Sequence, residues 1–452
     1  MSDTLNALVE IITTQTAALQ SAYTKTGSEI PSVDSPFQPN SLEFDPAAAE
    51  ARHLIVAAAS QLIATVQSPI DYLQDQLSGM FDTVNMGFVV DVNIPEILKE
   101  KGPQGAHIEE LAEATGVEAS YLGRVLRYLA TRHIFKEMAP NVFSHNRQSS
   151  LLTKAKSLKT IQEDPISRFD NAPLAAFIHI ASDELLTAST AFSSFIKNPE
   201  QASAPFNVAY KTSSKMWDWF EEPGNEVRSR RFTTAMKSSA ESMYPPEIFT
   251  SGIDGSSLKA GDVVVDVGGG TGAATLVLQK AFPDLRFVVQ DLGQQIAVAK
   301  EFWNEQNAEA VKSGQVTLQV HDFFTPQPIK NAAVYFLRVI IHDWADQKAR
   351  EILKSIRLAA GDQSKLVLFE MLAKHVTEAA ASSLSAEPPY PLLPNLGVAG
   401  AGFFTMLDMA LLTMYNGKER TYEEYARLGQ ETGWKLEEVR PGKLSALIFT
   451  PI

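Results

Sequence analysis

The stretch that decides the fold is VVVDVGGGTGAATLVLQKAF, residues 263–282. It predicts an apolar strand that ends at Asp266, then a glycine turn, then a helix. Glycine lets the backbone turn tightly and approach a ligand closely, and the N-terminus of the following helix offers free N–H groups. The turn reads D-x-G-x-G-x-G through Gly268, Gly270 and Gly272, and it also satisfies the G-x-G-x-x-A pattern of dinucleotide sites. Taken alone, it leaves NAD and S-adenosylmethionine (SAM) both open as cofactors.

Strand and helix patterns alternate from residue 261 onward. The short apolar, β-rich runs are DVVVDV (262–267), RFVVQD (286–291), VTLQVHD (316–322), AAVYFLRVII (332–341) and KLVLFEM (365–371). This alternation predicts an α/β fold whose parallel sheet is doubly wound and Rossmann-like. Folds of this kind bind ligands at the carboxyl ends of their strands.

Acidic residues stand at successive predicted strand ends. Asp291 ends the strand after the glycine turn, where a carboxylate can accept hydrogen bonds from both ribose hydroxyls. A cap of the strand end is the alternative role for Asp291. Asp322 ends the next strand and is followed by Phe323, whose ring offers a face for an adenine. Together with Asp266, these positions indicate a nucleoside site more strongly than the glycines do.

His342 follows an apolar strand and precedes a helix, so it is expected at the same edge as the glycine turn. A neutral imidazole there can remove a proton from a hydroxyl close to the cofactor. Glu370, at the end of the next strand, and Glu419 are two carboxylates that could orient it and favour its protonated form. A capping or packing role is the alternative for His342, and a surface or capping role is the alternative for each glutamate.

The N-terminal half is helical. Residues 1–25 and 49–77 predict long helices, and the Ser-, Pro- and Asp-rich residues 26–48 predict a linker. Residues 88–147 predict a helix-turn-helix with a β-wing, which raises DNA binding as a function. The second helix carries few cations, Arg124 and Arg127, between apolar faces, so packing or dimerisation is favoured. The predicted domains are 1–48, 49–200 and 201–452.

Composition limits the remaining function classes. The chain has 452 residues, and Lys+Arg 39 against Asp+Glu 53 gives a net charge of −14. This disfavours nucleic acid or an anionic membrane as the main partner. The absence of cysteine excludes disulfides, thiolate metal sites and a thiol nucleophile. No signal segment or apolar run long enough to span a membrane is apparent, and a cytoplasmic location is expected.

The chain from about residue 50 to 450 resembles plant- and fungal-type class I O-methyltransferases that use SAM. The matching pieces are FTTAM (232–236), VDVGGGTG (265–272), QDL (290–292), HDFF (321–324), LRVIIHDW (337–344), LFEM (368–371) and MLDMALLTMYNGKERTYEEY (406–425). The order and spacing of these pieces match the family. The N-terminal module resembles that family's winged-helix-like dimerisation domain, and a homodimer is expected.

The resemblance implies roles for individual residues. The implied cofactor contacts are Asp266, Gly268, Gly270, Gly272, Asp291, Leu292, Asp322, Phe323 and Arg338. His342 matches the catalytic base, and Glu370 and Glu419 match its supporting acids. Met236, Trp344, Met406, Met409 and Tyr415 match positions that line the acceptor pocket, and Thr233 and Met414 are further candidates for it. No metal is implied, and the expected substrate is a greasy polyketide, alkaloid or phenolic hydroxyl compound.

A second reading stays open. Some fungal relatives of this family bind SAM without transferring its methyl group and act as pericyclases on pyridone quinone methides, where the sulfonium charge polarises a carbonyl. Three features fit that reading: the long N-terminus, the enlarged segment 373–404, and the side chains of Thr233, Arg338 and Met414, which could shape a nonplanar substrate. A plain surface loop is the alternative for 373–404, and the set His342, Glu370 and Glu419 fits methyl transfer. A nicotinamide oxidoreductase and a DNA-binding regulator each explain only one of the motifs.

Overall fold

The computed structural model describes residues 2–39, 41–43, 45–243, 247–377 and 387–452, which fall into two compact units. The helical unit comprises the described residues within 1–240, 376–378 and 387–403. The sheet unit comprises those within 241–375, 379–386 and 404–452. The predicted fold class, a Rossmann-like domain with an N-terminal helical module, is confirmed.

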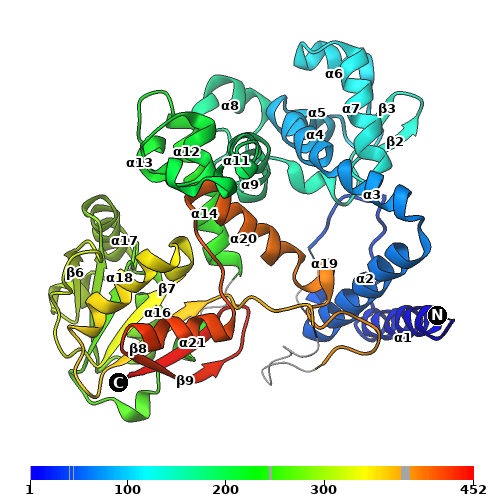
Figure 1. The fold of residues 1–452 in the computed structure, drawn as a ribbon. Helices are drawn as coiled ribbons and strands as arrows, with labels where there is room; N and C mark the ends of the chain where they lie inside the picture. Colours follow the sequence, from blue (N-terminus) through cyan, green and yellow to red (C-terminus); the bar gives the residue numbers. More distant parts are fainter. Residues whose placement is uncertain (1, 40, 44, 244–246, 378–386) are drawn as a thin grey trace. The chain divides into compact units, whose positions relative to one another are not determined.

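The sheet unit is built on seven strands in the order β6-β5-β4-β7-β8-β10-β9. Strands β6, β7, β8 and β9 of this sheet are labelled in Figure 1. They are β4 (Val263–Val267), β5 (Arg286–Asp291), β6 (Val316–Val320), β7 (Val334–Arg338), β8 (Lys365–Glu370), β9 (Trp434–Arg440) and β10 (Ser445–Pro451). The first five are the predicted runs, and they are parallel. The antiparallel pair β9 and β10 extends the sheet beyond β8 and was not predicted.

Alternate residues of each strand face opposite sides of the sheet, and each side has its own core. Val264 and Phe336 pack with α16 (Ala273–Ala281) and α17 (Gly293–Lys312). Their neighbours Val265 and Leu337 pack with the helices of the other side, α18 (Asp346–Arg357) and α21 (Tyr422–Glu431). Because both faces are covered, the central strands are apolar throughout, which is why they were readable from the sequence.

The strand order reverses between β4 and β7. From β4 the chain passes to β5 and β6 on one side, and β7 and β8 follow on the other side. The carboxyl ends of strands that flank such a switch point form the ligand-binding crevice of doubly wound folds. The turn after β4 carries the glycines at 268–272, and the turn after β7 carries His342.

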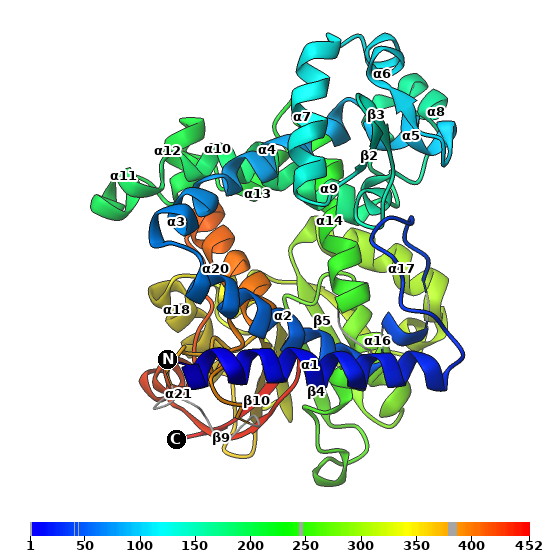
Figure 2. The ribbon, with the colours of Figure 1, turned by 90° about the vertical axis from the view of Figure 1, so that its right-hand side faces the viewer.

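The N-terminal helices of the helical unit are α1 (Ser2–Lys25), α2 (Pro46–Val66) and α3 (Pro69–Leu77). The prediction of one helix over 49–77 was wrong, because Ser68 caps α3 through a hydrogen bond from the Asp71 N–H and Pro69 begins the new helix. Helices α1 and α2 lie side by side (Figure 2), with Leu8 and Ala58 fully buried between them. The described residues between 26 and 45 include a short 3₁₀ turn (Ser41–Glu43), in keeping with the predicted linker.

The predicted helix-turn-helix and wing are present. The elements are α4 (Gly79–Asp91), α5 (Ile94–Lys101), β1 (Ala106–His107), α6 (Ile108–Thr115), α7 (Ala119–Thr131), β2 (Lys136–Ala139) and β3 (Val142–Ser144). Gly116 ends α6 with φ 72°, a left-handed conformation that glycine adopts without strain. Leu122, Leu126 and Leu129 of α7 are fully buried, so this helix uses its apolar face as core.

The remaining helices complete both units. They are α8 (Leu158–Glu163), α9 (Pro173–Ile180), α10 (Leu186–Ser189), α11 (Phe192–Lys197), α12 (Pro205–Tyr210), α13 (Met216–Phe220), α14 (Glu226–Met243), α15 (Glu247–Thr250), α19 (Gly397–Gly400) and α20 (Gly402–Tyr415). A π-helical turn (Ala181–Leu185) joins α9 to α10. Among the described residues, no helix has the length and apolar character needed to cross a membrane.

Candidate active site

The glycine turn after β4 uses its glycines for two different purposes. Gly268, Gly270 and Gly272 all have positive φ, at 72°, 58° and 78°. A Cβ on Gly272 would lie 2.7 Å from Nε1 of Trp303, so this glycine permits close packing. A Cβ on Gly270 would meet no atom within 4 Å. The backbone of the turn is therefore open at Gly270, where a cofactor can approach it.

Asp291 holds this turn in place. One carboxylate oxygen accepts the Gly270 N–H at 2.8 Å and the other accepts the Leu292 N–H at 2.7 Å. Burial raises the pKa of the Asp291 carboxyl. Each oxygen keeps a second lone pair, so the carboxylate can still accept ribose hydroxyls. The residue predicted to bind ribose therefore also shapes the glycine turn, while the Leu292 side chain is exposed.

Asp266 lies beneath the turn. Its carboxylate is buried and accepts a hydrogen bond from the Thr275 hydroxyl at 2.6 Å. Burial raises the pKa of Asp266 to about 6. A Cβ on Gly269 would lie 2.6 Å from the Asp266 carboxyl carbon. Asp266 thus connects the end of β4 to the first turn of α16 and supports the glycine turn.

Aromatic rings lie next to the glycine turn at Gly268. Phe323 lies 3.5 Å from the position that a Cβ on Gly268 would take. Its ring is 5.9 Å from Trp344, and the Phe324 ring is 4.7 Å from Trp344. Asp322 is exposed and accepts the Phe324 N–H at 2.9 Å, which shapes this loop. The structure therefore brings Trp344, predicted for the acceptor pocket, together with the ring predicted for adenine.

The turn that leads from β7 to His342 has a strained backbone conformation that hydrogen bonds hold in place. Val339 has φ 52°, an uncommon value for a β-branched residue. Its N–H donates to the Phe369 carbonyl at 2.9 Å. Glu370, at the end of β8, accepts the N–H groups of Ile340 at 3.2 Å and Ile341 at 2.8 Å. This carboxylate therefore fixes the backbone just before His342.

His342 is almost fully buried and has a carboxylate beside each ring nitrogen. Its Nδ1 lies 2.8 Å from Oε1 of Glu419, and its Nε2 lies 3.3 Å from Oδ1 of Asp343. Burial alone would lower the pKa of the imidazole, but the negative charges of Asp343, Glu370 and Glu419 outweigh it and raise the pKa to about 10. Both predicted acids are at the histidine: Glu419 orients the ring, and Glu370 acts through its charge and the backbone.

Two residues of this site were missed at the sequence level. Asp343 follows His342 directly, burial raises its pKa to about 6, and it accepts a hydrogen bond from the Tyr415 hydroxyl. Arg420 is buried and donates to the carbonyls of Ile341 at 3.0 Å and Trp344 at 2.7 Å. Asp343 could have been found from its place in the H-D-W motif. Arg420 gave no local signal.

The other predicted pocket residues are distributed over both units. Met406 and Met409 on α20 are 37% and 47% exposed, whereas Met414 is 6% exposed and belongs to the packed interior. Thr233 and Met236 are exposed residues of α14 in the helical unit. In the sheet unit, Arg338 lies over the Phe249 ring at 5.6 Å. The roles of these residues in binding remain predictions.

His342, Glu370 and Glu419 offer three ligand-type atoms within 4.8 Å of one another. One oxygen each of Glu370 and Glu419 is buried and has no hydrogen-bond partner among the described residues. Such a set can also hold a metal ion, so the expectation of a metal-free site stays a prediction.

Residues 196–435 match the O-methyltransferase domain, and residues 75–155 match the O-methyltransferase dimerisation domain. The chain belongs to the O-methyltransferase family. An O-methyltransferase of Armillaria gallica is 38% identical over 417 residues, which cover 89% of this chain and 88% of that protein. The choice between NAD and SAM, which the glycine turn left open, is decided for SAM.

Solved structures share the fold of this family member. The structure of LepI in complex with SAM has a TM-score of 0.64 at 19% identity and covers 98% of this chain and 100% of its own. A structure described as a pericyclic reaction enzyme has a TM-score of 0.62 at 20% identity, with 89% and 94% covered. At these identities the likeness concerns the fold.

Proposed function

We propose that this O-methyltransferase family member transfers the methyl group of SAM to a hydroxyl of a polyketide, alkaloid or phenolic small molecule, with His342 as base. The observation that carries the proposal is the 2.8 Å contact between His342 and Glu419, at the strand edge that also carries the glycine turn. When bound, SAM supplies an already activated methyl group. The protein then has to position the acceptor oxygen and remove its proton.

The glycine turn and Asp291 fit the SAM molecule that the family requires. Gly270 leaves its backbone open, and the Asp291 carboxylate has lone pairs left for the ribose. Phe323 borders the same turn and supplies an apolar face for the adenine, and the Trp344 ring packs against it. The exposed methionines Met406 and Met409 supply a soft apolar lining for the acceptor.

The protonation state of His342 decides whether it can act as the base in methyl transfer. With a pKa of about 10, the imidazole holds a proton at neutral pH, whereas a general base must be neutral. Asp343 occupies the Nε2 side, so an acceptor hydroxyl must take its place before Nε2 can receive a proton. Methyl transfer is therefore expected to accelerate as the pH rises.

The same observation favours a second candidate function, a SAM-dependent pericyclase that cyclises a pyridone quinone methide without methyl transfer. A protonated His342 donates a hydrogen bond and carries positive charge, and both polarise a substrate carbonyl. The negative charges of Asp343 and Glu419 hold the imidazole in that form. This chemistry uses the protonated state that dominates at neutral pH.

Mass spectrometry of the product separates the two candidates. Methyl transfer adds one CH₂ to the substrate and releases one equivalent of S-adenosylhomocysteine per turnover. A pericyclase leaves SAM unchanged, and its product has the substrate composition or that of the substrate less water. Turnover that requires SAM but produces no S-adenosylhomocysteine would replace the first proposal with the second.

We also infer that the protein is a homodimer. The support is a run of exposed apolar side chains on α3 and the start of α4, close to or within the segment that matches the dimerisation domain. These are Ile70, Leu73, Leu77, Met80 and Phe81, which are 50–73% exposed. Contiguous apolar surface of this kind marks protein–protein contact.

A further inference from the structure

Helices α14 and α20 each have residues in both compact units, and both carry residues predicted for the acceptor pocket. Helix α14 begins in the helical unit and carries Thr233 and Met236, and helix α20 begins there as well and carries Met406 and Met409. A pocket selects its ligand only if the side chains that line it are held in place by the surrounding structure. What holds the first turns of each helix therefore bears on the choice of acceptor.

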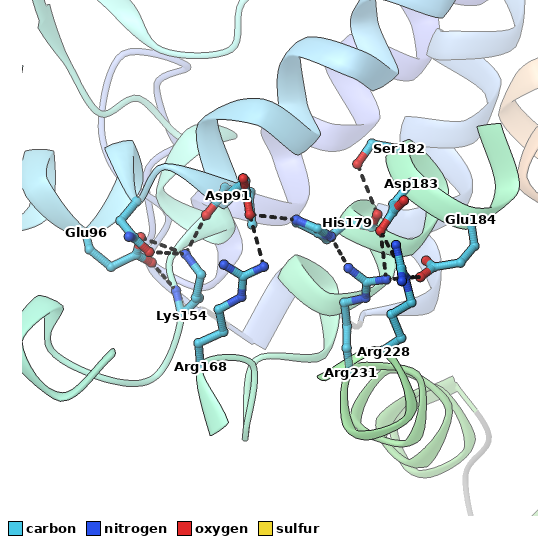
Figure 3. A network of polar contacts seen from close by, with 12 residues as sticks. Asp91, Glu96, Lys154, Arg168, His179, Ser182, Asp183, Glu184, Arg228 and Arg231 are labelled. Atoms are coloured by element: carbon cyan, nitrogen blue, oxygen red, sulfur yellow. Dashed lines mark hydrogen bonds and ion pairs between the residues drawn. The ribbon is translucent and has the colours of Figure 1, made fainter. Parts of the chain in front are cut away.

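Helix α14 is held by a network of ion pairs (Figure 3). Arg228 contacts Glu184 at 3.0 Å, and Arg231 contacts Asp183 at 3.3 Å as well as Glu184. Both acids lie on the π-helical turn after α9. Because these arginines are paired with the acids of that turn, the network attaches α14 to its own unit.

Helix α20 is attached through the segment that precedes it. One residue, Ala401, separates it from α19, and the Ala401 N–H donates to the Gly397 carbonyl at 2.8 Å. A Cβ on Gly400 would lie 2.4 Å from the Asn395 carbonyl oxygen, so this turn is tightly packed. The Phe403 ring, in the first turn of α20, lies beside α9. The place where α20 begins therefore follows from where α19 is held, with Phe403 as a further contact.

Helices α1 and α2 hold this segment through an apolar contact. Leu392 is 8% exposed and packs in one cluster with Leu8 of α1 and Ala58 of α2. Leu396 and Ala399 pack against the same cluster. Helix α19 itself lies against α2 (Figure 1). The apolar faces of α1 and α2 thus bind the residues that lead into α20.

Two hydrogen bonds give this contact a direction. The Gln61 Nε2 donates to the Pro391 carbonyl at 2.8 Å, and the Thr4 Oγ1 lies 3.2 Å from the Tyr390 hydroxyl. The partners are 330 and 386 positions apart in the chain. Two features that stand out in the sequence, the long N-terminus and the enlarged segment 373–404, are therefore in contact with each other.

We propose that α1 and α2 determine which acceptors the enzyme takes, because they hold residues 390–399 and so fix the first turns of α20. Met406 and Met409 lie one and two turns along that helix, and a fixed start keeps both side chains at a defined place in the acceptor pocket. Gln61 and Leu392 are then positioning residues that act through α20. The inference rests on the proposed function, because it takes α20 as a wall of the acceptor pocket.

Hydrogen–deuterium exchange of the full-length protein tests the attachment. Leu392→Asn replaces the buried side chain with a polar one of similar size, and Gln61→Glu replaces the amide donor with an acceptor that repels the Pro391 carbonyl. In both variants, the amides of residues 402–409 should exchange at least tenfold faster than in the wild type. Leu392→Met, which keeps an apolar side chain of similar volume, should retain the wild-type exchange rate.

A spin label provides a second measurement that needs no turnover. Because the sequence has no cysteine, Met406→Cys gives one attachment point for a nitroxide. Its electron paramagnetic resonance spectrum should show greater mobility when Leu392→Asn is added. Val398→Asn, at a 67% exposed position of α19, is the control and should change neither the mobility nor the exchange rate.

The consequence for the acceptor is measured with 1-naphthol, a simple apolar phenol. Leu392→Asn and Gln61→Glu should raise the KM for 1-naphthol at least fivefold, while kcat and the affinity for SAM change less than twofold. A structural defect spread over the whole protein would change all three quantities. Leu392→Met and Val398→Asn should keep the wild-type KM.

Two results would overturn the proposal. The first is a wild-type exchange rate of residues 402–409 in folded Leu392→Asn and Gln61→Glu, since the N-terminal helices would then not hold α20. The second is faster exchange with an unchanged KM for 1-naphthol, since α20 would then not select the acceptor. Wild-type protein that binds SAM but transfers no methyl group to a phenol would contradict the proposed function instead, and the exchange and spin-label measurements would still decide the attachment.

Discussion

Nδ1 of His342 lies 2.8 Å from Oε1 of Glu419, although the two residues are 77 positions apart in the chain. The backbone joins the same two segments, because the Lys418 N–H donates to the His342 carbonyl at 2.7 Å. Arg420 adds hydrogen bonds to the carbonyls on either side of the histidine. The orientation of the imidazole is therefore built into the backbone as well as into the side chains.

His342→Ala should lower the rate of methyl transfer by about 10²- to 10⁴-fold, because a positioned general base contributes that much. The affinity for SAM should change less than twofold, since within the described part of the chain the ring nitrogens of His342 bond to Glu419 and Asp343 and not to a residue assigned to the cofactor. Radiolabelled methyl transfer and calorimetry measure the two quantities. His53→Ala, an exposed histidine on α2, is the control, and an unchanged rate in His342→Ala would remove the base assignment.

Asp343→Asn should shift the pH–rate profile toward lower pH. Asp343 is one of the carboxylates whose negative charge raises the pKa of His342 to about 10, so its removal lowers that pKa and a larger fraction of the base is neutral at pH 7–8. The measurement is kcat over pH 6–10 for both proteins. A profile that keeps its midpoint would show that Asp343 does not control the titration of His342.

Gly270→Ala should weaken SAM binding at least tenfold while leaving the protein folded. The new Cβ meets no protein atom, so the loss of stability is limited to the backbone cost at positive φ, about 1–2 kcal/mol. Gly314→Ala is the matched control, because Gly314 also has positive φ and open space around it. Calorimetry measures the SAM affinity of both variants, and urea unfolding measures their stability. Equal SAM affinities would contradict the assignment of the glycine turn to the cofactor.

The free energy of unfolding should fall between pH 7 and pH 10, in part because of His342. A pKa raised from 6.5 to about 10 by folding gives stability that is complete below pH 6.5 and is lost as the pH rises through 10. In His342→Gln the slope should be less steep, by up to about 1.4 kcal/mol per pH unit. Urea unfolding at pH 7, 8, 9 and 10 measures it, and parallel curves would contradict the raised pKa.

Leu73→Asp combined with Leu77→Asp should convert the dimer into a folded monomer. Both side chains are more than 60% exposed in the isolated chain, so the charges do not disturb its core, but they would be buried without partners in an interface. Light scattering at micromolar concentration gives the mass. Leu358→Asp, at an 84% exposed leucine of the sheet unit, should remain dimeric.

The sequence predicted what local patterns encode. The five parallel strands were readable because their runs are short, rich in apolar and β-branched residues, and alternate with helical stretches. The helix-turn-helix was readable from its periodicity and from Gly116. Strand β9 escaped because WKLEEVR carries four charged residues and lies at the edge of the sheet, where one face is exposed. The break before Pro69 has a local signal in the sequence, a serine N-cap followed directly by proline.

The residues of the candidate site could be predicted from the sequence, but most of the contacts between them could not. His342, Glu370 and Glu419 were named, and they converge. That Glu370 binds backbone N–H groups, and that Asp343 occupies the second nitrogen of the imidazole, depends on the path of the turn after Val339. That path has no signature in a single sequence, because it results from tertiary contacts with β8 and with the segment at 418–420.

Val339 gives this turn a particular meaning for protein engineering. A valine at φ 52° is in a strained backbone conformation, and interactions elsewhere in the sheet unit compensate for the energetic cost. Selection for heat tolerance would favour glycine or asparagine here, and selection for turnover would favour whichever residue keeps the imidazole in register. A selection for thermostability and a selection for catalytic rate would therefore favour different residues at position 339.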